Sequence, residues 1–166
     1  SRPRACASRT APTERSGVGP DGACVSNEVA AAQRDVVEEF SFLDDWMQRY
    51  QYLIDLGRRL PEFPDALRTE EHRIRGCQSQ VWFVPRRSGD RLEFEAISDA
   101  AIVSGLIALL LRIYSGKRPR EILDTPPDFV RELGLETHLS PTRSTGLHSM
   151  LEAIRRFATA ALEADA

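Results

Sequence analysis

The sequence predicts an α+β fold in which a small antiparallel or mixed sheet of two to three strands packs against several helices. Apolar residues recur at helical spacing in about four segments, whereas two neighbouring segments have the alternating or continuous apolar character of strands. The two strands follow each other directly, which separates this pattern from a parallel β-α-β arrangement. A chain of 166 residues is long enough to bury the core of one such domain.

Two helices are expected in the first part of the domain. The first begins at residue 28, and its apolar positions are Val29, Val36, Val37 and Phe40. The second begins near residue 43 or 44, and its apolar face is formed by Trp46, Tyr50, Leu53, Ile54 and Gly57. Two prolines, Pro61 and Pro64, end this helix because proline lacks the amide hydrogen that continues it.

A β-hairpin and a buried helix are expected next. Residues 80–84 and 92–97 are the strands, and the segment between them contains the turn sequence Ser88-Gly89-Asp90. Residues 100–113 are apolar on most sides and predict a buried helix, with Ser98 and Asp99 as N-cap candidates. A short helix and loops are expected over residues 122–135, and an amphipathic helix follows the turn at 140–142.

Composition excludes several classes of protein. Gly, Pro and Cys are near or below their average abundance, which excludes collagen-like and disulfide-scaffold chains. A net charge of −3 argues against a dedicated nucleic-acid binder. The longest apolar stretch is shorter than the roughly 20 residues that span a membrane, so no membrane partner is expected. Three cysteines without a C-x-x-C pair favour free thiols in a reducing cytoplasm.

The first 27 residues are expected to be disordered, and residues 28–166 to form the ordered domain. The N-terminal segment has almost no large apolar side chains, so it cannot offset the entropy lost on ordering. A targeting peptide is an alternative interpretation, because the segment is rich in Arg and Ser and poor in acidic residues. Its lack of apolar periodicity weighs against that alternative.

The segment around Cys77 carries the clearest chemical signal. Cys77 lies between Gly76 and a strand, which places its sulfur at the tip of a loop. Arg73 and Arg75 are close in sequence, and because nearby cations lower the pKa of a thiol, we expect a reactive thiolate. The polar side chains available to a charged sulfur species are Gln78, Ser79 and Gln80. The alternative is that Cys77 is a small buried hydrophobic residue.

Residues 75–82, Arg-Gly-Cys-Gln-Ser-Gln-Val-Trp, closely resemble the signature loop of the SufE family, the sulfur acceptors of iron–sulfur cluster assembly, which include CsdE. Residues 52–61, 98–108 and 139–147 resemble further family segments in the same order. Together these blocks extend over about residues 40–160, most of the expected domain. One departure is Thr145, where we expect Asn or Gln in the family.

The resemblance implies a mechanism and its partners. A SufE-like protein takes sulfur from the persulfide of a pyridoxal-phosphate cysteine desulfurase, SufS-like or CsdA-like, and stimulates that enzyme. Cys77 would carry the sulfur as a persulfide and pass it to a SufB-type cluster scaffold. The protein would be a carrier and not a stand-alone enzyme. It would need no cofactor or metal of its own, because the pyridoxal phosphate belongs to the partner.

Two further residues match family positions. Asp99 matches an Asp at the start of the buried helix, where N-capping or local support is its simplest role and a direct chemical role is the alternative. Arg143 matches an Arg before the last helix. It either steadies the Cys77 loop or the persulfide charge with its planar donors, or only pairs with a carboxylate. His72 is an alternative base or metal ligand but is more typical of a surface loop.

Three other functions compete with this interpretation. A pyridoxal-phosphate desulfurase is rejected because the sole lysine, Lys117, lies in a turn and not in a cofactor pocket. A metal-binding or iron–sulfur scaffold of NifU/IscU type, whose fold is similar to that of SufE, remains the main alternative. It needs several converging ligands, whereas the expected domain contains one thiol, Cys77. An interaction module with an incidental Cys77 is the third possibility.

Overall fold

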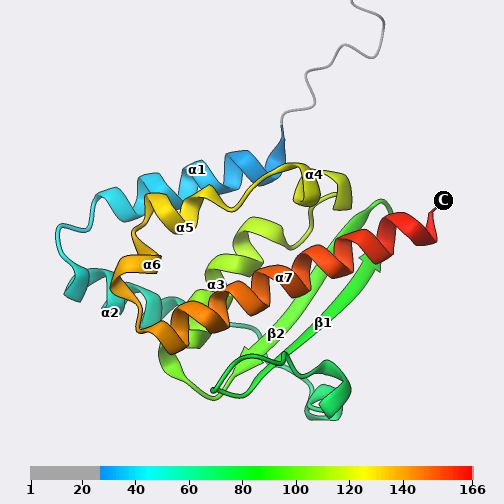
Figure 1. Ribbon diagram of the computed structural model, residues 1–166, viewed down its shortest axis with the longest axis horizontal. Helices are drawn as coiled ribbons and strands as arrows, with labels where there is room; N and C mark the ends of the chain where they lie inside the picture. Colours follow the sequence, from blue (N-terminus) through cyan, green and yellow to red (C-terminus); the bar gives the residue numbers. More distant parts are fainter. Residues whose placement is uncertain (1–26, 166) are drawn as a thin grey trace, which may run out of the picture.

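The computed structural model describes residues 27–165. This part of the chain contains seven α-helices and a two-stranded antiparallel sheet (Figure 1). The elements are α1 (Glu28–Ser41), α2 (Trp46–Arg58), the 3₁₀ turns η1 (Asp65–Leu67) and η2 (Glu70–His72), β1 (Val81–Ser88), β2 (Arg91–Ser98), α3 (Ala101–Tyr114), α4 (Pro119–Asp124), α5 (Asp128–Glu132), α6 (Leu135–His138) and α7 (Pro141–Ala164). This confirms the predicted α+β class. Disorder was predicted for residues 1–27; residues 1–26 lie outside the described part of the chain, whereas Asn27 is described and caps α1.

The long helices lie where the apolar spacing predicted them. Asn27 caps α1 by accepting a hydrogen bond from the Ala30 amide at 3.1 Å. The second helix begins at Trp46, later than expected, because the Asp45 carboxylate caps it through the Gln48 amide at 2.8 Å. The segment that was predicted as one short helix and loops contains three short helices, α4, α5 and α6.

The hairpin is longer than predicted. Its pairing runs from Val81 opposite Ser98 to Ser88 opposite Arg91, so residues 85–88, which were assigned to the connecting loop, continue β1. Pro85 fits in the strand because a two-stranded sheet consists of edge strands, where the missing amide hydrogen breaks no ladder. Gly89 in the turn has φ +63°, a conformation that favours glycine.

Helix α3 lies at the centre of the core and contacts α1, α2, α7 and β2 (Figure 1). Its approach to α2 depends on two glycines. A Cβ on Gly105 would lie 2.2 Å from the Leu53 carbonyl oxygen, and one on Gly57 would lie 2.7 Å from the Gly105 nitrogen. The two backbones therefore touch directly, and this contact positions the first turn of α3 near the loop that carries Cys77.

None of the helices between residues 27 and 165 combines the length and the apolar character that a membrane-spanning segment requires.

Candidate functional site

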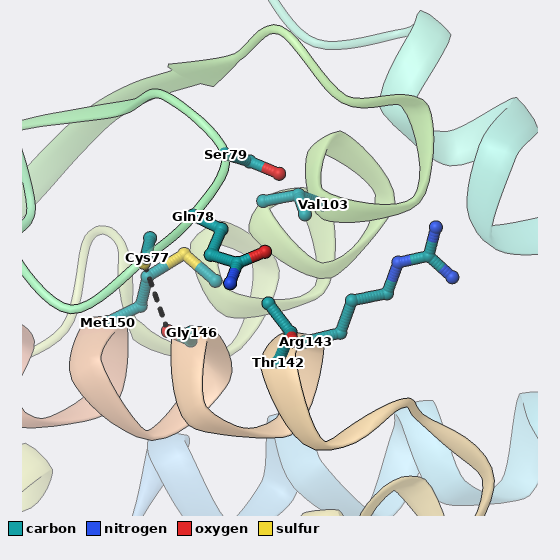
Figure 2. A pocket seen from close by; sticks show the side chains of 8 residues that line it. All are labelled: Cys77, Gln78, Ser79, Val103, Thr142, Arg143, Gly146 and Met150. Carbon is teal, nitrogen blue, oxygen red and sulfur yellow. Dashed lines mark hydrogen bonds between the residues drawn. The ribbon is translucent and has the colours of Figure 1, made fainter.

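Cys77 lies in the loop between η2 and β1, and its sulfur faces the second turn of α7 (Figure 2). The thiol is half-buried and donates a hydrogen bond from Sγ to the Gly146 carbonyl oxygen at 3.5 Å. A cavity of about 20 Å³ lies beside the sulfur. Its lining residues come from the loop, α3 and α7: Cys77, Gln78, Ser79, Val103, Thr142, Arg143, Gly146 and Met150.

Both ends of the Cys77 loop are fixed by hydrogen bonds. Before the cysteine, the Ile74 amide donates to the Val81 carbonyl oxygen at 2.9 Å. After it, the Asp99 carboxylate accepts from the Gln80 amide at 3.0 Å, and the Asp99 amide donates back to the Gln80 carbonyl oxygen at 3.3 Å. The predicted N-cap role of Asp99 is wrong, because its carboxylate bonds to Gln80; the N-cap of α3 is Ala100, without a side-chain bond.

Two glycines bring the loop and α7 together. Gly76 has φ +92°, and a Cβ there would lie 2.5 Å from Ser149 Oγ. The positive φ strains any residue with a side chain, and the Ser149 hydroxyl would have to rotate away from the added Cβ. On the helix side, a Cβ on Gly146 would lie 3.3 Å from Cys77 Sγ. The closed position of the sulfur therefore depends on a missing side chain on each side of the contact.

The electrostatics of the thiol differ from the prediction. Burial raises the pKa of the Cys77 thiol, because desolvation disfavours the thiolate. Arg73 does not lower it, since its guanidinium pairs with Glu70 at 3.3 Å, and the Arg75 side chain is exposed and does not line the cavity. The expectation that these two cations activate the thiol is wrong for the closed loop.

The structure divides the other candidate residues into two groups. Gln78, Ser79 and Arg143 line the cavity, whereas Gln80 bonds to Asp99 outside it. The Arg143 guanidinium points away from Cys77 in Figure 2, and within residues 27–165 it forms no ion pair. Pairing with a carboxylate, one of its two predicted roles, is therefore not observed.

His72 is the last residue of the 3₁₀ turn η2 and is not among the residues that line the Cys77 cavity. Its Nδ1 lies 3.1 Å from Thr69 Oγ1 and 3.0 Å from the Leu67 carbonyl oxygen. Across the described part of the chain, no group of three or more His, Cys, Asp or Glu side chains converges as a metal site would require. The single thiol of this part of the chain, Cys77, is thus without nearby ligand partners.

Apart from Arg143, the residues that α3 and α7 contribute to the cavity were not predicted from the sequence. Val103 and Met150 are buried and form apolar walls, and Thr142 and Gly146 complete the lining. The available signal was Gly146, because a glycine inside a long helix costs about 1 kcal/mol relative to Ala and marks a close approach.

The fold and the site define a small α+β protein organised around one loop cysteine that packs against a helix.

A family model described as SufE, Fe-S metabolism associated domain, matches residues 34–158. Uncharacterized SufE-like proteins are similar over most of the chain. That of Rhizobium meliloti (strain 1021) is 46% identical over 134 residues, 78% of this chain and 96% of that protein. That of Rhizobium etli is 47% identical over 131 residues, 75% of this chain and 88% of that protein.

A solved structure has the same fold. The solution structure of a hypothetical protein from Thermus thermophilus matches with a TM-score of 0.67 and 25% identity, over 80% of this chain and 96% of that one. The chain therefore belongs to the SufE family and is a protein of iron–sulfur metabolism. Membership implies partners within that pathway.

Proposed function

We propose that this protein is a sulfur acceptor that takes persulfide sulfur from a pyridoxal-phosphate cysteine desulfurase onto Cys77 and passes it to a SufB-type cluster scaffold. The observation that carries the proposal is the placement of Cys77 Sγ at a loop tip, beside a small cavity and against the Gly146 carbonyl oxygen. In this proposal the protein is a cytoplasmic carrier that stimulates a SufS-like or CsdA-like enzyme by removing its persulfide.

The proposed transfer is an exchange reaction between sulfurs. The Cys77 thiolate attacks the outer sulfur of the desulfurase persulfide, and a new S–S bond forms on Cys77. The S–S bond in the desulfurase breaks, and its cysteine leaves as a thiolate. No external oxidant or reductant is needed, because the sulfane sulfur moves with its oxidation state unchanged. A second exchange of the same kind delivers the sulfur to a scaffold thiol.

Because the pKa of Cys77 is raised, the environment of its thiol must change before the thiolate can attack. With the loop closed, the thiol is protonated near neutral pH and its sulfur faces α7 and the cavity. We infer that docking of the desulfurase opens the loop and returns the thiol to a polar environment, where its thiolate fraction rises. Closure afterwards would shield the persulfide from cellular reductants.

The surrounding residues have separate roles in this proposal. Gln78 and Ser79 line the cavity and would donate hydrogen bonds to a negatively charged terminal sulfur. Arg143 is at the cavity rim and is free for a charged group of the partner or of the persulfide once the loop moves. Asp99 and Gln80 hold the end of the loop and guide its return, whereas Arg75 is exposed for contact with the partner.

The test is intact-protein mass spectrometry after incubation with a cysteine desulfurase and free cysteine. Wild type is expected to gain one reducible sulfur and to raise the desulfurase turnover, and Cys77→Ser is expected to do neither. A Cys6→Ser/Cys24→Ser double variant is the matched control and should behave as wild type. A gain that persists in Cys77→Ser, or no gain in wild type, would refute the assignment. Metal analysis of the same preparation separates the carrier from a cluster scaffold.

A further inference from the structure

We propose that the cavity beside Cys77 is sized for one extra sulfur atom while the loop is closed, and that Gly146 sets this limit. The inference rests on the proposed function and deepens it, because it specifies the cargo. The closed protein would protect a persulfide, whereas a chain of two or more extra sulfurs would hold the loop open.

The volume of the cavity is the first argument. It measures about 20 Å³, well below the roughly 150 Å³ of a cavity that binds a guest the size of benzene. The outer sulfur of a persulfide lies about 2.05 Å from the sulfur that carries it, so it would occupy the space directly beside Cys77 Sγ. A third sulfur extends the chain by another bond of that length and exceeds the available space.

The walls provide the second argument, because two sides of the cavity cannot move easily. On one side, Val103 and Met150 are 6% and 1% exposed and belong to the packed core. On the other side is the backbone of α7 at Gly146, where a Cβ would lie 3.3 Å from Cys77 Sγ and 3.9 Å from Cys77 Cβ. The hydrogen on Gly146 therefore leaves the space that a methyl group would fill.

The chemistry of the lining is the third argument. Side chains of Gln78, Ser79 and Thr142 offer N–H or O–H donors, and none of the lining residues is acidic. Figure 2 shows the Gln78 amide projecting between Cys77 and the first turns of α7. A persulfide is anionic when deprotonated, so a cavity with donors and without carboxylates suits its terminal sulfur.

The limit can be tested without a desulfurase by loading sulfur from inorganic polysulfide. The Cys77 thiolate attacks a terminal sulfur of the polysulfide dianion; one S–S bond forms on Cys77, one breaks, and a dianion shorter by one sulfur leaves. Folded protein is loaded in excess polysulfide, treated briefly with dithiothreitol, denatured, capped with iodoacetamide and digested with trypsin. Cleavage after Arg75 and Arg86 isolates Cys77 from the other cysteines, so the sulfurs on peptide 76–86 can be counted.

Three variants give distinct expectations. Wild type should retain one extra sulfur that resists dithiothreitol in the folded state. Gly146→Ala should accept sulfur but lose this protection, so that dithiothreitol removes the sulfur as fast as from denatured protein. Met150→Ala enlarges the cavity and should retain two or more extra sulfurs. Thr159→Ala, an exposed position 13 residues further along α7, is the matched control and should behave as wild type. Circular dichroism verifies that each variant is folded.

Two results would overturn the inference: longer sulfur chains protected in wild type as well as the persulfide, or full protection in folded Gly146→Ala. The desulfurase experiment tests the proposed function separately from the size limit. If a desulfurase loads no sulfur but polysulfide gives one protected sulfur, the proposed function falls and the size limit stands.

Discussion

Replacement of Gly76 by alanine should shift the Cys77 loop from the closed to the open position. Gly76 has φ +92°, and a Cβ at this residue would lie 2.5 Å from Ser149 Oγ. A side chain there meets two penalties, an unfavourable backbone conformation and a close contact that the Ser149 hydroxyl must rotate to relieve. The fold does not depend on this contact, because the residue lies outside the helices and the hairpin.

The magnitude follows from the two penalties. An L-residue in a left-handed conformation costs roughly 1–2 kcal/mol. A free-energy change of one or two kcal/mol alters an equilibrium by a factor of about 5–30, and rotation of the Ser149 hydroxyl adds a smaller cost. We therefore expect the open fraction of the loop to rise at least about 5-fold, with only a small change in global stability.

The assay is the rate of Cys77 alkylation by iodoacetamide in native buffer, read on peptide 76–86. Gly76→Ala should react at least about 5-fold faster than wild type. Gly89→Ala is the matched control, because it also has a positive φ of +63° but nothing within 4 Å of its Cβ, and it lies in the hairpin turn. It should leave the alkylation rate unchanged. Adding Ser149→Ala to Gly76→Ala removes the clash and should restore part of the protection.

Two outcomes would refute this reasoning. If Gly76→Ala reacts at the wild-type rate, the contact with α7 does not hold the loop closed. If Gly89→Ala accelerates the reaction as strongly, the effect is general destabilisation and not release of the loop.

Three further predictions follow from the same contacts. Asp99→Ala removes the acceptor of the Gln80 amide, a bond worth about 1 kcal/mol, and should speed Cys77 alkylation several-fold without a matching loss of melting temperature; an unchanged rate would contradict the anchoring role. Burial raises the pKa of Cys77 above its ordinary 9.0, so the closed loop favours the protonated thiol. The contribution of the protonated thiol to the stability of the closed state is complete below the pKa that Cys77 has in the unfolded chain. It is lost as pH rises through the pKa that Cys77 has in the folded protein. Alkylation should therefore show an apparent pKa above 9.0 that falls in denaturant, and a lower native value would disprove the desolvation argument. Gly105→Ala forces a Cβ to within 2.2 Å of the Leu53 carbonyl oxygen, so overpacking of about 1–3 kcal/mol should lower the melting temperature by several degrees; a melting temperature equal to wild type would contradict the close α2–α3 contact.

Local patterns in the sequence predicted most of the fold, because each depends on neighbours along the chain. The apolar spacing from Val29 to Phe40 and the run from residue 100 to 113 identify helices that bury one face or nearly all faces. The hairpin follows from two apolar segments with Gly89 between them, although the strand length was underestimated at Pro85. Pro85 is tolerated there only because β1 has a single partner strand in the sheet, which is a property of the tertiary structure.

The site was predicted in part, for a similar reason. The loop sequence identified Cys77 as the chemically interesting residue and Gly76 as its flexible neighbour. It gave the wrong direction for the thiol pKa, because proximity of Arg73 along the chain does not determine where its guanidinium lies. In the structure Arg73 pairs with Glu70, and the surroundings of the sulfur are supplied by α7.

The sequence by itself determined the α+β class, the position of the long helices and the thiol at a loop tip, since these depend on periodicity and on residue type. Only the tertiary structure decided that the carbonyl oxygen of Gly146, 69 residues away, accepts the hydrogen bond of the Cys77 thiol. It also decided that Asp99 anchors the loop and does not cap α3. The physical reason is that desolvation and cavity size depend on which distant segments pack together. Local sequence does not contain those distances; the packing of α3 and α7 creates them.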